Sequence, residues 1–182
     1  MGFENAEEKE GRETKKLGDF LGGQEKGDRW ELPTDMDVVD PATDEFEERL
    51  KRAGCTPEEI DHLSLSFREM LINGMAHGNM GIPEINEGED LKARATQELL
   101  QKSTAKKVFV ALTVSKNLVK VTVEDQGEGF DWRNIPDPSA EENVLKTHGR
   151  GIFLIRYRLE KLGGSVAFNK KGNEISIALE RK

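Results

Sequence analysis

The sequence predicts a two-layer α+β sandwich in which a mixed or antiparallel sheet of four to five strands carries helices on one face. Short segments in which apolar and polar residues alternate indicate strands, and longer segments with apolar residues at helical spacing indicate helices. The expected strands are residues 30–32, 107–114, 118–124, 165–168 and 174–179, and the expected helices are residues 44–53, 57–77, 89–102 and 150–162. Residues 126–149 lack periodicity, which predicts a long binding loop or lid on the open side of the domain.

Composition limits the class of protein. Only 35% of the 182 residues are hydrophobic and 34% are charged, and Glu, Lys and Gly dominate residues 1–28. These residues are expected to be a disordered tail, and residues 29–182 to be one folded domain. The formal net charge of −8 argues against a nucleic-acid partner, because phosphates require a basic surface.

The cellular location follows from what the sequence lacks. Cys55 is the single cysteine, which rules out an intramolecular disulfide and fits a reducing compartment. No apolar run reaches the length of a membrane span, and no signal-peptide pattern opens the chain. We therefore expect a soluble, cytoplasmic protein without a membrane partner.

The helices have clear start and stop signals. Phe46 and Leu50 lie on one face of the first helix, which Gly54 ends. Thr56 and Glu59 form a capping box around Pro57 at the first helical position, so the second helix should run from there to about His77.

The rest of the chain follows the same logic. Leu91, Ala95 and Leu99 predict an amphipathic helix, and residues 115–117 suit a hairpin turn between two alternating strands. A final helix should begin at Arg150 and stop at a Gly-Gly pair, before two strands that close the chain.

The first candidate site lies on the second helix, where Glu69, Asn73 and His77 are spaced four apart and share one stripe. For Glu69 and Asn73 alone, a solvated face is the alternative interpretation. However, apolar neighbours on both sides indicate partial burial, and Asn is a poor helix former that tends to be placed for a hydrogen bond or a ligand. A carboxylate and an amide oxygen on adjacent turns can hold Mg²⁺. His77 lacks the further protein ligands of a zinc site, so we expect it to make a hydrogen bond near the helix end.

Two glycine-rich segments form the other candidates. Asp125 ends an apolar strand, and Gly127 and Gly129 let the backbone approach a ligand closely, although the same pattern also describes an ordinary turn. A carboxylate held there can accept a hydrogen bond from an exocyclic amine. Residues 148–151 (HGRG) open the last helix, where free N–H groups and the helix dipole can bind an anion; a flexible loop is the alternative.

Taken together, E-x-x-x-N on a helix, D-x-G-x-G-F after a strand and G-x-G opening a helix resemble the Bergerat-fold (GHKL) ATPases, over about residues 30–182. Within that superfamily, N-G-M-A-H-G-N (residues 73–79), G-R-G-I-F-L-I-R (residues 149–156) and the single-domain size are similar to the anti-sigma-factor serine/threonine protein kinases.

The resemblance implies a histidine-kinase-like ATPase fold with ATP and Mg²⁺ as cofactors. It implies Glu69 as the general base, Asn73 as the Mg²⁺ ligand and Asp125 on the adenine amino group. The residues implied to shape the nucleotide pocket and its lid are His77, Gly127, Gly129, Phe130, Gly149, Arg150 and Gly151.

This chain departs from the pattern in three places. Gly172, Asn173 and Glu174 stand where many relatives place Thr, residues 84–106 look like a helical insertion, and Gly74 replaces the usual Ala. Gly74 should cost about 1 kcal/mol of helix stability unless close packing requires it.

The resemblance implies a protein kinase that phosphorylates a STAS-type anti-anti-sigma protein, binds a sigma factor and so regulates transcription. Relatives often form homodimers. A non-catalytic, ATP-dependent binding module is the main alternative. A histidine-kinase catalytic domain is a weaker one, because we find no preceding dimerisation segment with a phosphoacceptor histidine.

Overall fold

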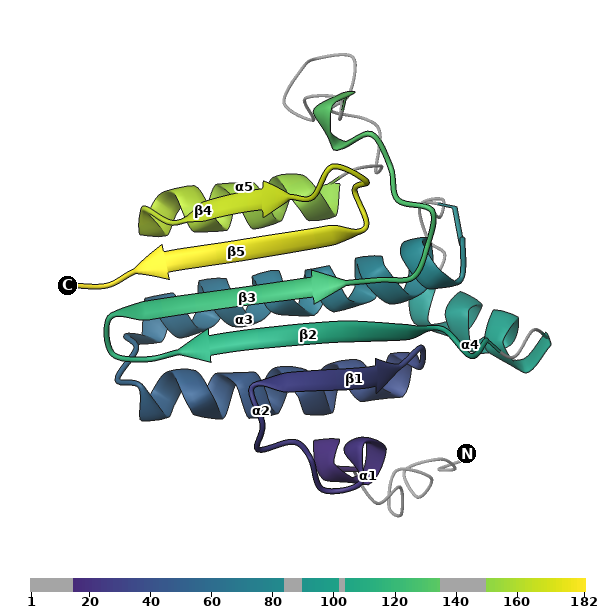
Figure 1. Cartoon of the computed structure of the whole chain (residues 1–182), viewed down its shortest axis with the longest axis horizontal. Coiled ribbons are helices and arrows are strands. Elements are labelled where there is room, and N and C mark those ends of the chain that lie inside the picture. Colours follow the sequence, from purple (N-terminus) through teal and green to yellow (C-terminus); the bar gives the residue numbers. More distant parts are fainter. Residues whose placement is uncertain (1–14, 84–89, 102–103, 135–149) are drawn as a thin grey trace, which may run out of the picture.

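The computed structural model describes residues 15–83, 90–101, 104–134 and 150–182. Its centre is a five-stranded sheet in the order β1-β2-β3-β5-β4, and every neighbouring pair is antiparallel (Figure 1). The strands are β1 (Arg29–Pro33), β2 (Lys107–Val114), β3 (Leu118–Glu124), β4 (Ser165–Phe168) and β5 (Glu174–Glu180). The expected α+β architecture is confirmed, and the sheet is antiparallel throughout.

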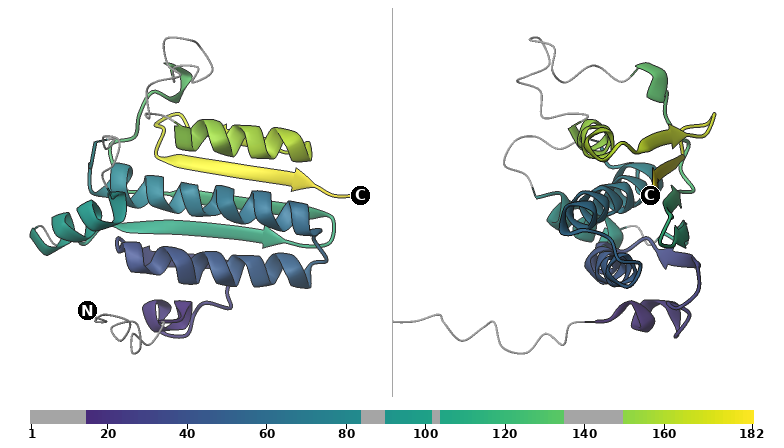
Figure 2. Two further views of the ribbon diagram at one scale, coloured as in Figure 1. Left: turned by 180° about the vertical axis from the view of Figure 1, so that it is seen from behind. Right: turned by 90° about the vertical axis from the view of Figure 1, so that its left-hand side faces the viewer.

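The helices gather on one face of the sheet, as Figure 2 shows from the side. They are α2 (Val39–Arg52), α3 (Pro57–Ile72) and α5 (Arg150–Leu162). Alternate strand residues are buried toward these helices, among them Val108, Val110 and Leu112 on β2. Burial of this apolar face against the helices holds the two layers together. Among the described residues, no helix is long and apolar enough to cross a bilayer.

The start of α3 has the predicted capping box. Glu59 N–H donates to Thr56 Oγ1 at 3.2 Å, and Thr56 N–H donates to Glu59 Oε2 at 2.7 Å. By contrast, α2 begins five residues before the expected position 44, at Val39. A short 3-10 turn, η1 (Met36–Val38), leads into it, and Val39 and Ala42 extend its buried face. The sequence signal missed this first turn because Pro41 interrupts it, although proline is tolerated at a helix start.

The expectation of one α-helix through His77 is wrong at its C-terminal end. The α-helix ends at Ile72 and continues as a π-helical turn, η2 (Asn73–Asn79). Met80 N–H donates to Met75 O at 3.0 Å, which is the i→i−5 bond of that winding. A π turn holds more residues than an α turn, so side chains after Asn73 point in other directions than the expected four-residue spacing gives.

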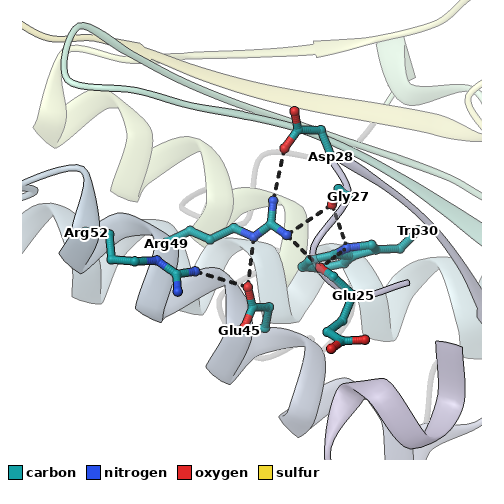
Figure 3. Close-up of polar contacts among 7 residues, drawn as sticks. All are labelled: Glu25, Gly27, Asp28, Trp30, Glu45, Arg49 and Arg52. Atoms are coloured by element: carbon teal, nitrogen blue, oxygen red, sulfur yellow. Dashed lines mark hydrogen bonds and ion pairs between the residues drawn. The ribbon is translucent and has the colours of Figure 1, made fainter. Parts of the chain in front are cut away.

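Residues 15–28 lie in the segment expected to be a tail, yet they are packed onto the domain. They include α1 (Leu17–Leu21), and Leu17 is buried. The Arg49 side chain on α2 holds the segment: it donates to the backbone oxygens of Glu25 and Gly27, pairs with Asp28 and lies over the Trp30 ring (Figure 3). Composition alone does not reveal a charged segment anchored through its backbone. Residues 1–14 lie outside the described part of the chain.

The predicted insertion at 84–106 is described in part. Helix α4 (Leu91–Gln101) matches the expected amphipathic helix, with Ala95 buried and Leu91 packed against the core. Residues 84–89 and 102–103 lie outside the described ranges.

Arg49 offers a test of the anchored N-terminal segment. Its side chain is 11% exposed and forms charge-assisted bonds to several oxygens, so Arg49→Ala should lower the free energy of unfolding by about 1.5–3 kcal/mol. Urea unfolding followed by tryptophan fluorescence measures the change.

The matched control is Arg52→Ala on the same helix. Arg52 also pairs with Glu45, but its side chain is 66% exposed, so the loss should stay within about 0.5 kcal/mol. Equal losses in the two variants would contradict the anchoring role of Arg49.

Candidate functional site

A cavity of about 810 Å³ opens where α3 and η2, the end of β3, the start of α5 and the β4–β5 turn meet. This volume lies in the range of small-molecule sites. Seven residues singled out from the sequence line it: Glu69, Asn73, His77, Asp125, Gly129, Phe130 and Gly151. Segments up to about 100 residues apart in the sequence are thus brought to one cavity.

The start of α5 lies directly against Glu69 and Asn73. A Cβ atom on Gly151 would lie 3.1 Å from Glu69 Oε2 and 3.3 Å from Asn73 Nδ2. Glycine therefore leaves a small space between the helix start and these two polar groups. The first N–H groups of a helix lack intrahelical partners and favour anions, so this end of the cavity combines an anion-binding helix start with hard oxygen donors.

Asp125 also lines the cavity, and it lies directly after β3, as predicted. Its Oδ1 accepts a hydrogen bond from Gly127 N–H at 2.7 Å. Burial raises the pKa of this carboxyl, while the Gly127 N–H and the charges of Lys171 and Lys106 oppose the rise. The group is thus a partly buried acceptor, suited to a ligand amine.

Gly78 makes room for that carboxylate. A Cβ atom on Gly78 would lie 2.3 Å from Asp125 Cγ, so any larger residue would displace the Asp125 side chain. The surroundings of Gly74 are different: a Cβ atom there would meet nothing closer than 3.6 Å, which is an ordinary van der Waals contact. Packing therefore does not require glycine at position 74.

Gly127 and Gly129 allow the segment after β3 to contact two other backbone stretches of the chain. A Cβ on Gly127 would lie 2.2 Å from Gly78 O, and one on Gly129, where φ is +77°, would lie 2.1 Å from Lys171 O. Lys171 Nζ in turn donates to Gly127 O at 2.8 Å. The two glycines thus allow the close backbone packing that forms this side of the cavity.

The aromatic and histidine candidates lie at the cavity edge. Phe130 is 43% exposed and packs edge-to-face on Phe168 at 5.9 Å between ring centroids. His77 Nδ1 makes a 2.7 Å hydrogen bond with Ile82 O, which is the role expected for it near the helix end. The bond orients the ring beside the cavity.

The residues that were not predicted as site residues include Asn79, Asn173 and Lys106, which line the cavity, and Lys171, which bonds to Gly127 O beside it. Asn79 is buried and belongs to the N-G-M-A-H-G-N segment, so its motif was a signal that could have found it. The Asn173 side chain donates to Asp125 O at 2.7 Å. Its carboxamide nitrogen is therefore bonded to the protein backbone.

Some predicted residues cannot be placed. His148 and Gly149 fall in residues 135–149, outside the described ranges. Arg150 is the first residue of α5.

Comparisons with known proteins give one family. The model of the histidine kinase-like ATPase domain matches residues 32–179. Among solved structures, a histidine kinase domain from the Erythrobacter litoralis EL346 blue-light activated histidine kinase is similar, with 15% sequence identity and a TM-score of 0.45. The match covers 82% of this chain and 61% of that chain, so this chain spans less than two thirds of its length. A search of curated proteins finds no match.

The raised pKa of Asp125 predicts a pH dependence of stability. Because the folded state holds this proton more tightly than the unfolded chain, the contribution of the carboxyl to stability is present below about pH 4 and is lost as pH rises through the raised pKa. Asp125→Asn keeps an oxygen that can accept the Gly127 N–H bond. The free energy of unfolding of Asp125→Asn should therefore increase relative to that of the wild type as pH rises from about 4 to 7.

Urea unfolding in buffers of different pH measures this difference in the free energy of unfolding between Asp125→Asn and the wild type. Asp61→Asn, at an exposed position on α3, controls for the loss of one negative charge. If the difference for Asp125→Asn stays constant with pH, or changes with pH only as much as that for Asp61→Asn, burial does not have the expected effect.

Proposed function

Because the chain belongs to the histidine kinase-like ATPase domain family, we propose that its cavity binds ATP together with Mg²⁺ and transfers the terminal phosphoryl group to a protein. One observation carries the proposal: the α5 start at Gly151 adjoins Glu69 and Asn73 in the same cavity that Asp125 lines. A ligand with an anionic end and an amine-bearing end fits this distribution.

The adenine belongs at the Asp125 side and the phosphates at the α5 side. The Asp125 carboxylate accepts a hydrogen bond from the 6-amino group, and apolar cavity residues such as Ile175 and Met80 contact the base. At the other side, the N–H groups that open α5 bind phosphate oxygens.

The donor set also fits Mg²⁺. Asn73 supplies an amide oxygen, a hard ligand of the kind this ion prefers, and the missing Cβ of Gly151 leaves space beside Asn73 and the neighbouring Glu69 carboxylate. We assign Asn73 as the protein ligand. When bound, the ion supplies positive charge against the phosphate oxygens.

Glu69 acts as the general base. It accepts the proton of a serine or threonine hydroxyl while the hydroxyl oxygen bonds to the γ-phosphorus and the bond to the bridging oxygen breaks, so that ADP leaves. A base so placed adds about 10²- to 10⁴-fold to the rate, and the α5 N–H groups stabilise phosphoryl charge.

The proposed partner is a STAS-type anti-anti-sigma protein, which would make this kinase an anti-sigma regulatory factor. The N-G-M-A-H-G-N and G-R-G-I-F-L-I-R segments support this assignment by resemblance. A surface feature supports a protein partner more generally: Phe153 and Tyr157 on α5 are stacked at 6.3 Å and are 36% and 45% exposed.

Glu69→Ala separates binding from chemistry. The variant should keep its affinity for ATP and lose about 10²- to 10⁴-fold in phosphotransfer, because only the proton acceptor is removed. Transfer from labelled ATP to candidate STAS proteins measures the rate.

Glu58→Ala, at an exposed position on the same helix, is the control and should transfer at the wild-type rate. Unchanged transfer in Glu69→Ala would refute its role as the base. ATP-dependent complex formation without transfer in the wild type would instead favour a non-catalytic switch.

Asn73→Ala tests the ion site. Mg²⁺ should strengthen ATP binding by the wild type, and the variant should lose most of that increase while its Mg²⁺-free affinity stays similar. Calorimetric titration with and without Mg²⁺ measures both. Asn117→Ala, in the β2–β3 turn, is the control, and the same Mg²⁺ dependence in Asn73→Ala as in this control would show that Asn73 is not the ligand.

A further inference from the structure

The peptide group between Asp125 and Gln126 is held by two buried asparagines. Gln126 N–H donates to Asn79 Oδ1 at 2.7 Å, and Asp125 C=O accepts from Asn173 Nδ2 at 2.7 Å. Asn79 and Asn173 are only 5% and 6% exposed. From here on, these two carboxamides are called the asparagine clamp.

We infer that the asparagine clamp sets the direction of the Asp125 carboxylate and so determines the selectivity of the site for purines that carry a 6-amino group. The inference rests on the proposed function, because it assigns positioning residues to the adenine side of that cavity. Asn79 and Asn173 act through Asp125.

Asn79 ties the peptide to the first two strands. Its Nδ2 donates to Thr34 Oγ1 at 2.8 Å and to Lys107 O at 2.9 Å. The Thr34 hydroxyl in turn donates a hydrogen bond to Lys106 O at 2.6 Å. The carboxamide of Asn79 thus makes three hydrogen bonds, two to backbone groups and one to a bonded hydroxyl, which leaves it little freedom to turn.

Asn173 ties the same peptide to the last hairpin. Its backbone O accepts from Asp125 N–H at 2.9 Å, and its Oδ1 accepts from Asn169 Nδ2 at 2.9 Å. Residue 125 is therefore bonded to Asn173 through both its N–H and its C=O. Together the two asparagines fix the backbone from which the Asp125 side chain leaves.

The fixed backbone matters because only a small space is available for the Asp125 carboxylate. It lies over the open side of Gly78, where a Cβ would be 2.3 Å from Asp125 Cγ, and Gly127 N–H holds its Oδ1. A rotated 125–126 peptide would carry the carboxylate out of this place. An interaction that depends on direction, such as acceptance from a 6-amino group, would weaken more than contacts along the rest of a nucleotide.

The test compares two ligands that differ only at position 6 of the purine. ATP carries the amino group, and purine riboside 5′-triphosphate carries hydrogen there, so the ratio of their dissociation constants isolates the Asp125 contact. The wild type should favour ATP by at least about tenfold, as a hydrogen bond to a charged group would give. In Asn79→Ala and in Asn173→Ala the ratio should fall to within about threefold of one.

Two further variants keep the result interpretable. Ser66→Ala removes a buried hydroxyl that donates to His62 O, and it should lower stability while keeping the wild-type ratio. Asn79→Asp retains the shape of the side chain and an acceptor for Gln126 but no longer donates to Lys107 O, so it carries the test where Asn79→Ala does not fold. The ratio should fall in this variant too.

The outcomes separate the clamp from the proposed function. Loss of discrimination in the clamp variants but not in Ser66→Ala supports the inference. Wild-type discrimination that persists in the folded clamp variants would overturn the clamp and leave ATP binding intact. Equal affinity of the wild type for both triphosphates would overturn the adenine assignment of Asp125 and the clamp with it.

Discussion

The site depends on close contact between three stretches of backbone that are far apart in the sequence. The segment after β3 touches η2 at Gly127 and Gly78, and it touches the β4–β5 turn at Gly129 and Lys171. A Cβ at either Gly127 or Gly129 would lie within 2.2 Å of a carbonyl oxygen, so side chains there would force these stretches apart. Because the glycines have no Cβ, side-chain hydrogen bonds can join these stretches: Asn79 accepts from Gln126 N–H, and Asn173 and Lys171 donate to the carbonyl oxygens of Asp125 and Gly127.

Much of the fold could be predicted from local patterns in the sequence. Alternation gave β2 and β3, and the capping box at Thr56 gave the start of α3, because these signals depend only on neighbouring residues. The packing of residues 15–28 could not be predicted this way. It depends on Arg49, which lies more than 20 residues away and bonds to backbone oxygens that have no sequence signature.

The candidate site shows the same division. Glu69, Asn73 and Asp125 carry recognisable chemistry, and the structure places all three at one cavity. Asn79 and Asn173 act on a peptide group, so only the three-dimensional arrangement reveals what they hold. The electrostatic balance is also hidden in the sequence: the chain is acidic overall, yet Lys106 and Lys171 lie near Asp125 and offset part of the effect of its burial.

The π-helical turn at Asn73–Asn79 makes the spacing of this segment as important as its composition. Each residue of an α-helix advances the side-chain direction by about 100°. If the same seven residues wound as an ordinary α-helix, each would turn further around the axis than it does in the π turn, and the later side chains would be rotated out of phase with the sheet. Asn79 would then no longer face Gln126, even though the residue itself was still present. Across related sequences, the length of this segment therefore carries information that a comparison of residue identities alone would miss.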